Sequence, residues 1–305
     1  MKKYKSNNRP LRSSLLAASL AASTMLASGP VSADPVTVVS WGGSYGAAQD
    51  AALFTDASRN SGIEIIRESG ASMSKTCLQV ESGSVTWDLV VTGSGGSASA
   101  AAKGCLEKID YSVVDVSNNV DGALEPALMA DGVPADKVYE VLSSKGGIDR
   151  AINKLRELKP HIAVFWGSGA QQAQLMKDAE VDMATGWNGR FDNAKKDGAK
   201  VGYTFNQALL DYDCFAMPKG APNKDMAMKF LNEISKPEYQ ANLPFHITYG
   251  PTNKKAYDLT TAPKELIESL PSHPKNVPLM LPISLAWYAE HRTEALEKYM
   301  EFMSE

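Results

Sequence analysis

The sequence has few of the residues that build metal and redox centres. It contains 3 cysteines and 4 histidines among 305 residues. They form neither a Cys-x-x-Cys pair nor the His-Glu-x-x-His motif of zinc peptidases, and zinc sites are usually built from such closely spaced residues. We therefore expect no metal and no cofactor.

Long apolar runs and basic clusters are also missing after the first 33 residues. No later segment reaches 18 uninterrupted apolar residues, the length that indicates a membrane-spanning helix. Residues 1–33 contain five basic and no acidic residues, so their removal moves the formal net charge from −4 to −9. Nucleic-acid binding needs clustered lysine and arginine to neutralise phosphates, so we expect no nucleic acid as a partner.

The N-terminus has the three parts of a secretory signal. Five basic residues precede an apolar stretch from Leu15 to about Leu26, and the small residues Ser32 and Ala33 permit cleavage. The apolar stretch is too short to span a bilayer. We predict a signal peptide over residues 1–33 and a periplasmic location, with an organelle-targeting peptide as the alternative.

The first half of the remaining chain alternates strands with helices. We predict strands at 35–41 (PVTVVSW), 63–69 (IEIIRES) and 86–92 (TWDLVVT), with helical stretches between them. This order predicts a mainly parallel α/β sheet, in which ligands bind beyond the carboxyl ends of the strands. Two glycine-rich segments, 42–46 and 93–97, lie at such ends. The second is expected to be a loop, either a flexible turn or part of a ligand cleft.

The second half is predicted to contain four more strands between helices, at 162–166 (IAVFW), 181–187 (VDMATGW), 200–206 (KVGYTFN) and 209–218 (LLDYDCFAMP). In the last of these, Asp211 and Asp213 stand two residues apart, and alternation puts both carboxylates on one face of the strand. Because aspartate is depleted in strands, the presence of two aspartates in this one requires an explanation. The pair could contact a ligand or chelate a divalent ion, as in sugar-transferring enzymes.

Three of the five tryptophans end predicted strands, namely Trp41, Trp166 and Trp187, and Tyr45 follows the first of them. Each ring could simply pack in a core. Together with the two carboxylates they indicate an aromatic box with acidic ends, which suits ammonium groups. Arg190 argues the other way, since it could bind an anionic group, although it could equally be a surface side chain.

The three cysteines are Cys77, Cys105 and Cys214. In an oxidising compartment two of them could pair. Cys77 falls in a predicted helix and Cys105 just after another, so we favour a disulfide between these two, with three free thiols as the alternative. Cys214 lies in an apolar run and is expected to be buried.

Three stretches of the second half carry further motifs: ATGWNGR at 184–190, LLDYDCFAMPKGAPN at 209–223 and HITYGPTNKKA at 246–256. With these motifs the chain resembles the bacterial extracellular solute-binding proteins of ABC importers, and among them the spermidine/putrescine-binding subgroup. The resemblance implies an α/β fold of the type II periplasmic-binding-protein kind, with two α/β lobes joined by a hinge. It also implies a monomer that binds and does not catalyse.

The resemblance implies a ligand site between the lobes. Its expected residues are Trp41, Tyr45, Ser94, Trp187, Asn188, Asp213 and Tyr249. Asp211 is added on alternation alone, and it stands where the subgroup usually has an aromatic ring. An additional carboxylate is compatible with a cationic ligand, but it replaces one of the aromatic rings that surround the ligand in the subgroup.

The lobes are expected to be unequal. We assign residues 34–118 and 215–305 to lobe 1, with the C-terminal helices, and residues 119–214 to a shortened lobe 2. Between about Val113 and Glu125 the family normally has a crossover strand and the start of the second lobe, several tens of residues in all. This chain passes almost directly across that interval, which predicts an internal deletion.

The predicted function is capture of a small cationic, polyamine-like solute and its delivery to the permease subunits of an ABC importer at the inner membrane. Three alternatives stay open. One is a secreted hydrolase or transferase that uses the Asp211-x-Asp213 pair. Another is a binding protein for a different solute, such as an amino acid or another small organic molecule. The third is a chain that no longer binds any ligand because of the predicted deletion.

Overall fold

The computed structural model describes residues 34–109 and 122–305. The predicted signal peptide therefore lies outside the described residues, as does most of the region near 113–125 where an internal deletion is predicted. Ser94 is described by its backbone only.

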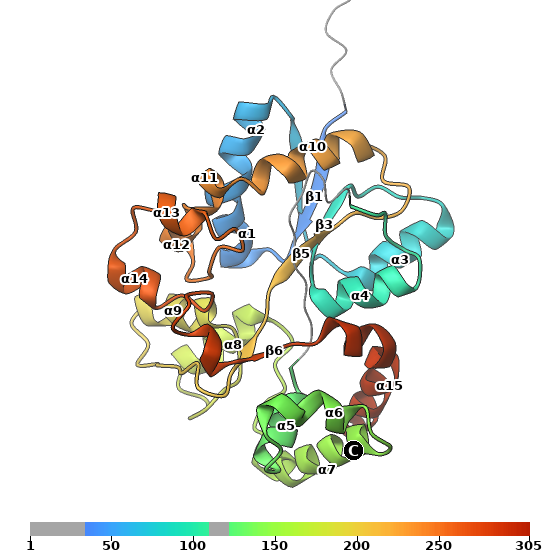
Figure 1. The fold of residues 1–305 in the computed structure, drawn as a ribbon, viewed down its shortest axis with the longest axis vertical. Helices are drawn as coiled ribbons and strands as arrows, with labels where there is room; N and C mark the ends of the chain where they lie inside the picture. Colours follow the sequence, from blue (N-terminus) through green and yellow to red (C-terminus); the bar gives the residue numbers. More distant parts are fainter. Residues whose placement is uncertain (1–33, 110–121) are drawn as a thin grey trace, which may run out of the picture. The chain divides into compact units, whose positions relative to one another are not determined.

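A four-stranded sheet organises the first part of the described chain (Figure 1). Its strands, in the order β2-β1-β3-β5, are β1 (Val36–Ser40), β2 (Ile65–Ser69), β3 (Leu89–Gly93) and β5 (Asp213–Ala216). β1 pairs in parallel with β2 and with β3, as the alternation of strands and helices predicts, whereas β5 pairs antiparallel with β3. All five residues of β1 are buried, which is typical of a strand covered on both faces.

Helices follow the first three strands. Those before the gap are α1 (Gly43–Gln49), a π-helical segment (Asp50–Phe54), α2 (Thr55–Ser61), α3 (Met73–Ser82) and α4 (Ser94–Ala102). The segment 93–97, which the sequence predicts as a loop, is therefore mostly helix. That prediction is wrong because α4 begins directly at the end of β3, where Gly93 is the N-cap residue in extended conformation.

The helices after the gap are α5 (Leu124–Ala130), α6 (Val138–Leu142), α7 (Gly147–Leu158), α8 (Gly169–Lys177), α9 (Asn188–Lys196), α10 (Lys224–Ile234), α11 (Pro237–Gln240), α12 (Leu243–His246), α13 (Ala256–Leu259), α14 (Lys264–Glu268) and α15 (Leu285–Ser304). Short 3₁₀ turns are formed by Ala135–Lys137, Lys159–His161 and Val277–Leu279. None of the described helices is both long and apolar enough to cross a bilayer.

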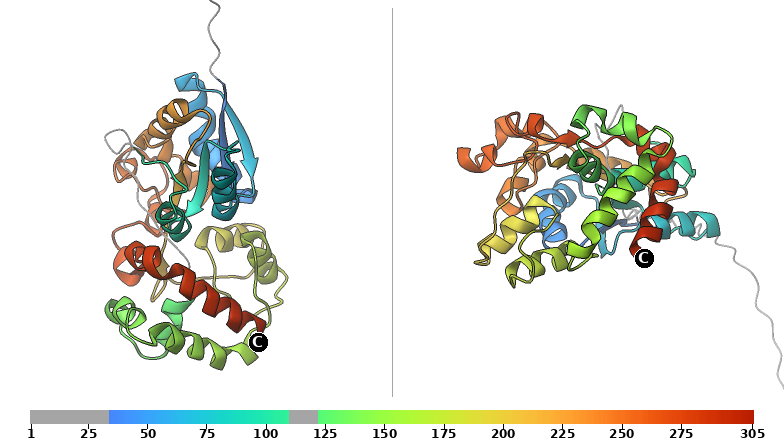
Figure 2. Two further views of the ribbon diagram at one scale, coloured as in Figure 1. Left: turned by 90° about the vertical axis from the view of Figure 1, so that its right-hand side faces the viewer. Right: turned by 90° about the horizontal axis from the view of Figure 1, so that it is seen from below.

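Two apolar cores hold these elements. The first surrounds the four-stranded sheet, and its largest side chains include Phe54, Leu89 and Phe230. The second is formed by α5, α6 and α7 together with α15, whose residues Trp287 and Phe302 are buried in it. In Figure 2 the red helix α15 lies beside the green helices α5–α7. The predicted lobe division places residues 281–305 in lobe 1, whereas their side chains share the second core with residues 124–152; the division stays a prediction.

The run LLDYDCFAMP is not one strand. Leu209–Leu210 forms the short strand β4, which pairs with β6 (Leu281–Pro282), while Asp213–Ala216 is β5 of the main sheet. The chain changes sheets at Asp211 and Tyr212, so alternation cannot be continued across this point. The prediction that both carboxylates share one strand face is therefore wrong.

Three other predicted strands, 162–166, 181–187 and 200–206, are extended or irregular segments without ladder partners among the described residues. Much of 162–166 and 181–187 is exposed, including Phe165 and Met183. Apolar composition favours a strand only where a neighbouring strand accepts its backbone hydrogen bonds. These segments have such composition, but no described strand lies beside them to accept their hydrogen bonds.

A disulfide joins Cys77 in α3 to Cys105 after α4, with the two Cα atoms 5.1 Å apart, and Cys214 is a buried free thiol. The bond closes a loop of 28 residues. Replacing Cys77 and Cys105 by alanine should destabilise the protein by about 2–4 kcal/mol and lower Tm by about 5–10 °C. Dithiothreitol should lower the Tm of the wild type by a similar amount and leave the double variant unchanged. An unchanged wild-type Tm in dithiothreitol would contradict the bond.

Candidate functional site

Sheet topology brings Asp213 to the edge where ligands of α/β proteins bind. β1 and β3 are parallel, so their carboxyl ends lie at one edge, where Trp41 follows β1 and Gly93 ends β3. β5 runs antiparallel to β3, and its first residue, Asp213, pairs with Gly93. An antiparallel strand thus brings its start to the edge at which its parallel neighbours end.

Two aromatic side chains from the segment after β1 hold the Asp213 carboxylate. The indole Nε1 of Trp41 donates to Oδ2 of Asp213 over 3.1 Å. The hydroxyl of Tyr45, in the first turn of α1, also hydrogen-bonds to this carboxylate. Tyr45 packs edge-on against Tyr249, with the ring centroids 5.3 Å apart. The Asp213 carboxylate, its two donors Trp41 and Tyr45, and the phenol ring of Tyr249 therefore lie close together.

Arg190 brings a positive charge to the same place. Its Nη1 donates to Oγ of Ser44 over 2.7 Å, and its guanidinium hydrogen-bonds to Tyr249. Its charge is close enough to favour the ionised form of Asp213. We call the five residues Trp41, Tyr45, Arg190, Asp213 and Tyr249 the Asp213 cluster.

Burial dominates the acid–base behaviour of this cluster. It raises the pKa of Asp213 from 3.8 to about 6, although the hydrogen bonds from Tyr45 and Trp41 and the charge of Arg190 all act to lower it. Burial likewise raises the pKa of Tyr45 and of Tyr249, and the charge of Asp213 adds to both shifts. Both phenols are thus neutral donors near neutral pH, and Asp213 is ionised at a desolvation cost.

Exposed ring surface lies beside the cluster. Trp41 is 44% exposed and Trp187 is 43% exposed. Trp166 stands edge-on to Trp187, with the centroids 5.0 Å apart. A Cβ at Gly169 would lie 2.7 Å from Arg190 Nε and 3.2 Å from the ring of Trp187, so both side chains pack over this glycine. Exposed aromatic faces beside a carboxylate can bind an ammonium group.

The start of α9, with the N-cap residue Trp187, is joined by a hydrogen bond to the segment that carries Tyr249. Asn188 Nδ2 donates to the carbonyl of Thr248 over 2.5 Å, and the same side chain hydrogen-bonds with the Tyr203 hydroxyl. Asn188 therefore supports the position of Tyr249. The structure thus brings Trp187 and Arg190, at the start of α9, together with Tyr249 from a separate segment.

Gly189 is needed for this contact, since a Cβ there would lie 2.6 Å from Tyr249 Cε1 and 2.8 Å from Ile247 Cγ1. We expect Gly189→Ala to lower the free energy of unfolding by about 1–3 kcal/mol through overpacking. Gly202→Ala is the matched control, because a Cβ there meets nothing within 4 Å. Urea denaturation measures both variants, and equal stabilities would contradict the close packing.

Two predicted site residues are placed differently from the rest. Asp211 is exposed between β4 and β5, and its charge acts on Tyr249 and on Tyr139 of the second core. Ser94 is the first residue of α4, and its side chain is not among those described. Sequence reasoning misses Ser44, whose only signal is its place in the glycine-rich turn after β1.

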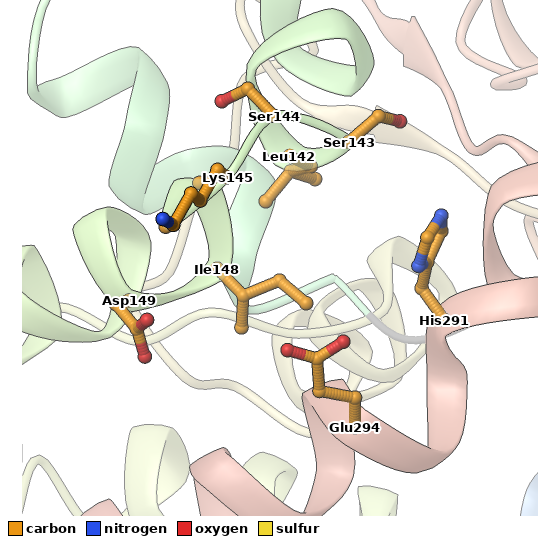
Figure 3. A pocket seen from close by; sticks show the side chains of 10 residues that line it. Leu142, Ser143, Ser144, Lys145, Ile148, Asp149, His291 and Glu294 are labelled. Carbon is orange, nitrogen blue, oxygen red and sulfur yellow. The ribbon is translucent and has the colours of Figure 1, made fainter.

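A separate pocket of about 280 Å³ lies between the α6–α7 turn and α15 (Figure 3). It is lined by none of the predicted site residues, and Figure 3 shows Lys145, Asp149, His291 and Glu294 among its side chains. Asp149 is paired with Lys298. Within the part of the chain that is described, no three histidine, cysteine or acidic residues are grouped to hold a metal ion.

Comparison with known proteins gives consistent similarities. A family model described as bacterial extracellular solute-binding protein matches residues 116–274. The chain is 30% identical to the gamma-aminobutyric acid-binding protein of Pseudomonas aeruginosa, over 87% of this chain and 89% of that one. It is 32% identical to the putrescine-binding periplasmic protein PotF of Escherichia coli, over 37% of this chain and 32% of that one.

A solved structure is similar over most of its length. The structure of MotA from A. tumefaciens B6 in complex with glucopine shares 36% identity and a TM-score of 0.83, covering 88% of this chain and 99% of that one. The alignment with the Pseudomonas protein runs over 317 positions, whereas 87% of 305 residues is about 265, so about 50 positions are filled by the relative alone. The internal deletion between about Val113 and Glu125 stays a prediction.

Proposed function

This chain belongs to the bacterial extracellular solute-binding proteins, and from that premise we propose that the Asp213 cluster captures a small solute carrying both an ammonium group and a carboxylate. The expected α/β fold of the periplasmic-binding-protein type is confirmed by the solved structures that the chain resembles. The chain is thus the solute-binding component of an ABC transporter.

The observation that carries the proposal is one carboxylate and one guanidinium in the same aromatic cluster. Asp213, held by Trp41 and Tyr45, would accept hydrogen bonds from the ligand's ammonium group. The exposed faces of Trp41 and Trp187 would stack on the adjoining carbon chain or cation. Arg190 would pair with the ligand's carboxylate, because its hydrogen bonds to Ser44 and Tyr249 leave Nε without a partner within the described residues.

A purely cationic solute such as a polyamine is the second candidate. Asp211 and Asp213 together would suit two ammonium groups, and the partial likeness to the putrescine-binding protein favours the same class. Arg190 weighs against it, since a fixed positive charge beside Asp213 repels a second ammonium group. A relative that binds gamma-aminobutyric acid, similar over most of its length, supports the zwitterionic ligand.

The proposal includes the cellular role. We infer that a signal peptide directs the chain to the periplasm, and that the loaded protein delivers its solute to the permease as a monomer without changing it chemically. Asp211 stays a proposed contact for larger ligands, and Asn188 is proposed to act through Tyr249.

A thermal-shift screen tests the proposed function. The panel contains 4-aminobutyrate, glucopine, putrescine, spermidine and simple carboxylic acids, each titrated to saturation. We expect a saturable rise in Tm with at least one zwitterion, with no product formed on prolonged incubation. A response to polyamines alone would favour the second candidate. A response to acids alone, or turnover of any compound, would contradict the proposal.

A further inference from the structure

Gln172 is a fully buried polar side chain in the first turn of α8, with 0% of its surface exposed. Its Oε1 accepts from the backbone N–H of Trp187 over 3.3 Å. Its Nε2 has no hydrogen-bond partner among residues 34–109 and 122–305. A buried donor without an acceptor costs about 1–3 kcal/mol and is rare in native proteins, so it requires a reason.

The orientation of this amide is fixed by its neighbours. If the amide were turned over, its NH₂ group would face the N–H of Trp187, and that bond would be lost. The Gln172 carboxamide also packs tightly against Gly186, since a Cβ added to this glycine would lie 2.1–2.4 Å from the amide atoms. The carboxamide therefore lies directly against the Gly186-Trp187 backbone, with its NH₂ group unsatisfied.

The amide lies near the first residues of α8. Side chains of a helix tilt toward its N-terminus, and Gln172 is three residues after Gly169, the first residue of α8. The ring of Trp187, whose backbone holds Gln172, packs over Gly169, since a Cβ added to this glycine would lie 3.2 Å from it. Trp187, the N-cap residue of α9, thus contacts both the Gln172 amide and the first residue of α8.

A second buried donor reaches the same helix end. Arg190 Nε has no partner within the described residues, and it lies 2.7 Å from the position of a Gly169 Cβ. Backbone N–H groups in the first turn of a helix lack intrahelical acceptors and form its positive end. In α8 the N-cap Ser168 accepts from one of them, the N–H of Gln171. Two unsatisfied side-chain donors therefore gather at a helix terminus that itself favours negative charge.

We propose that Gln172 Nε2, Arg190 Nε and the N-terminus of α8 form the subsite for the acidic end of the ligand, and that Gln172 selects ligands by this end. The inference rests on the proposed function and adds the residue that discriminates acids from amines. The two oxygens of a carboxylate can accept from both side-chain donors. Both donor atoms are covered by protein here, so the ligand reaches them when the segments beside Trp187 separate.

The test compares Gln172→Met with Gln174→Met. Methionine has a similar length and no donor, and Gln174 is an exposed glutamine on the same helix. Affinities are measured by calorimetry for 4-aminobutyrate and for propylamine, which lacks the carboxylate. We expect Gln172→Met to weaken 4-aminobutyrate binding about tenfold or more and to change propylamine binding less than about twofold. Gln174→Met should change neither.

A spectroscopic measurement separates a direct contact from a structural one. The side-chain ¹⁵N–¹H resonances of Gln172 should shift when the wild type is saturated with 4-aminobutyrate and stay in place with propylamine. Equal losses for both probes, or an unshifted amide, would overturn the subsite while leaving the proposed function intact. If wild type binds propylamine as tightly as 4-aminobutyrate, the proposed function itself fails, and the subsite fails with it.

Discussion

Asp213→Asn is expected to weaken 4-aminobutyrate binding by about thirtyfold or more and at the same time to stabilise the ligand-free protein. The variant removes the charge that pairs with the ligand's ammonium group, while the amide can still accept from Trp41. Truncating one partner of a desolvated charge pair costs about 2–5 kcal/mol, a loss of affinity of about thirtyfold to several thousandfold. Calorimetric titration at pH 7 measures this loss.

The gain in stability follows from the raised pKa of Asp213. Its folded-state value of about 6 lies above 3.8, the ordinary value for an unfolded chain, so the native state binds the additional proton between these two pH values. The contribution of Asp213 to the free energy of unfolding is therefore largest below about pH 4, and it is lost as the pH rises through about 6. Above that range Asp213→Asn should be more stable than wild type by about 1–3 kcal/mol.

The pH dependence supplies the control within one experiment. The difference in Tm between Asp213→Asn and wild type should be small at pH 4 and reach its full size at pH 7. Asp258→Asn changes an exposed carboxylate of α13 and should show no difference at either pH. A variant that is destabilised at pH 7, or that binds 4-aminobutyrate normally, would show that Asp213 is a structural residue.

Arg190→Gln is expected to reverse the preference of the site from zwitterions toward amines. The variant loses the partner of the ligand's carboxylate, which should weaken 4-aminobutyrate binding by about thirtyfold or more. At a pH at which Asp213 is ionised in both proteins, propylamine should bind at least as well to the variant as to wild type, because a positive charge near Asp213 has been removed. The ratio of the two dissociation constants, measured by calorimetry, reports the change.

Two further results belong to this variant. The charge of Arg190 lowers the pKa of Asp213, so in Arg190→Gln that pKa should rise above 6 and amine binding should need a higher pH. Arg59→Gln is the control, since Arg59 is an exposed residue of α2 paired with Asp56. Parallel losses for 4-aminobutyrate and propylamine would mean that Arg190 holds the fold rather than the ligand.

The sequence predicts the main sheet well because its signals are local. Apolar β-branched runs alternate with helices in the first half, and β1, β2 and β3 form where this order predicts them. The segments 162–166 and 181–187 have similar composition but remain without ladder partners in the described chain. The composition of a segment does not show whether a neighbouring strand is present, so the two predicted strands at 162–166 and 181–187 are wrong.

The candidate site is predictable in part. The sequence places Asp213, Trp41, Tyr45 and Tyr249 in it, and the structure brings them together with Arg190. The hydrogen bond between Arg190 and Ser44 joins residues 146 positions apart, and no spacing rule reveals such a contact. Alternation fails between Asp211 and Asp213 because it assumes a continuous strand, whereas the chain changes sheets between them.

The most direct test of the central claim is a crystal structure of the protein with bound 4-aminobutyrate. We predict the ligand nitrogen within about 3 Å of the Asp213 carboxylate and a ligand carboxylate oxygen at a similar distance from the Arg190 guanidinium. The carbon chain should lie against the rings of Trp41 and Trp187. A ligand bound in the opposite direction, or bound away from both charged residues, would contradict this arrangement.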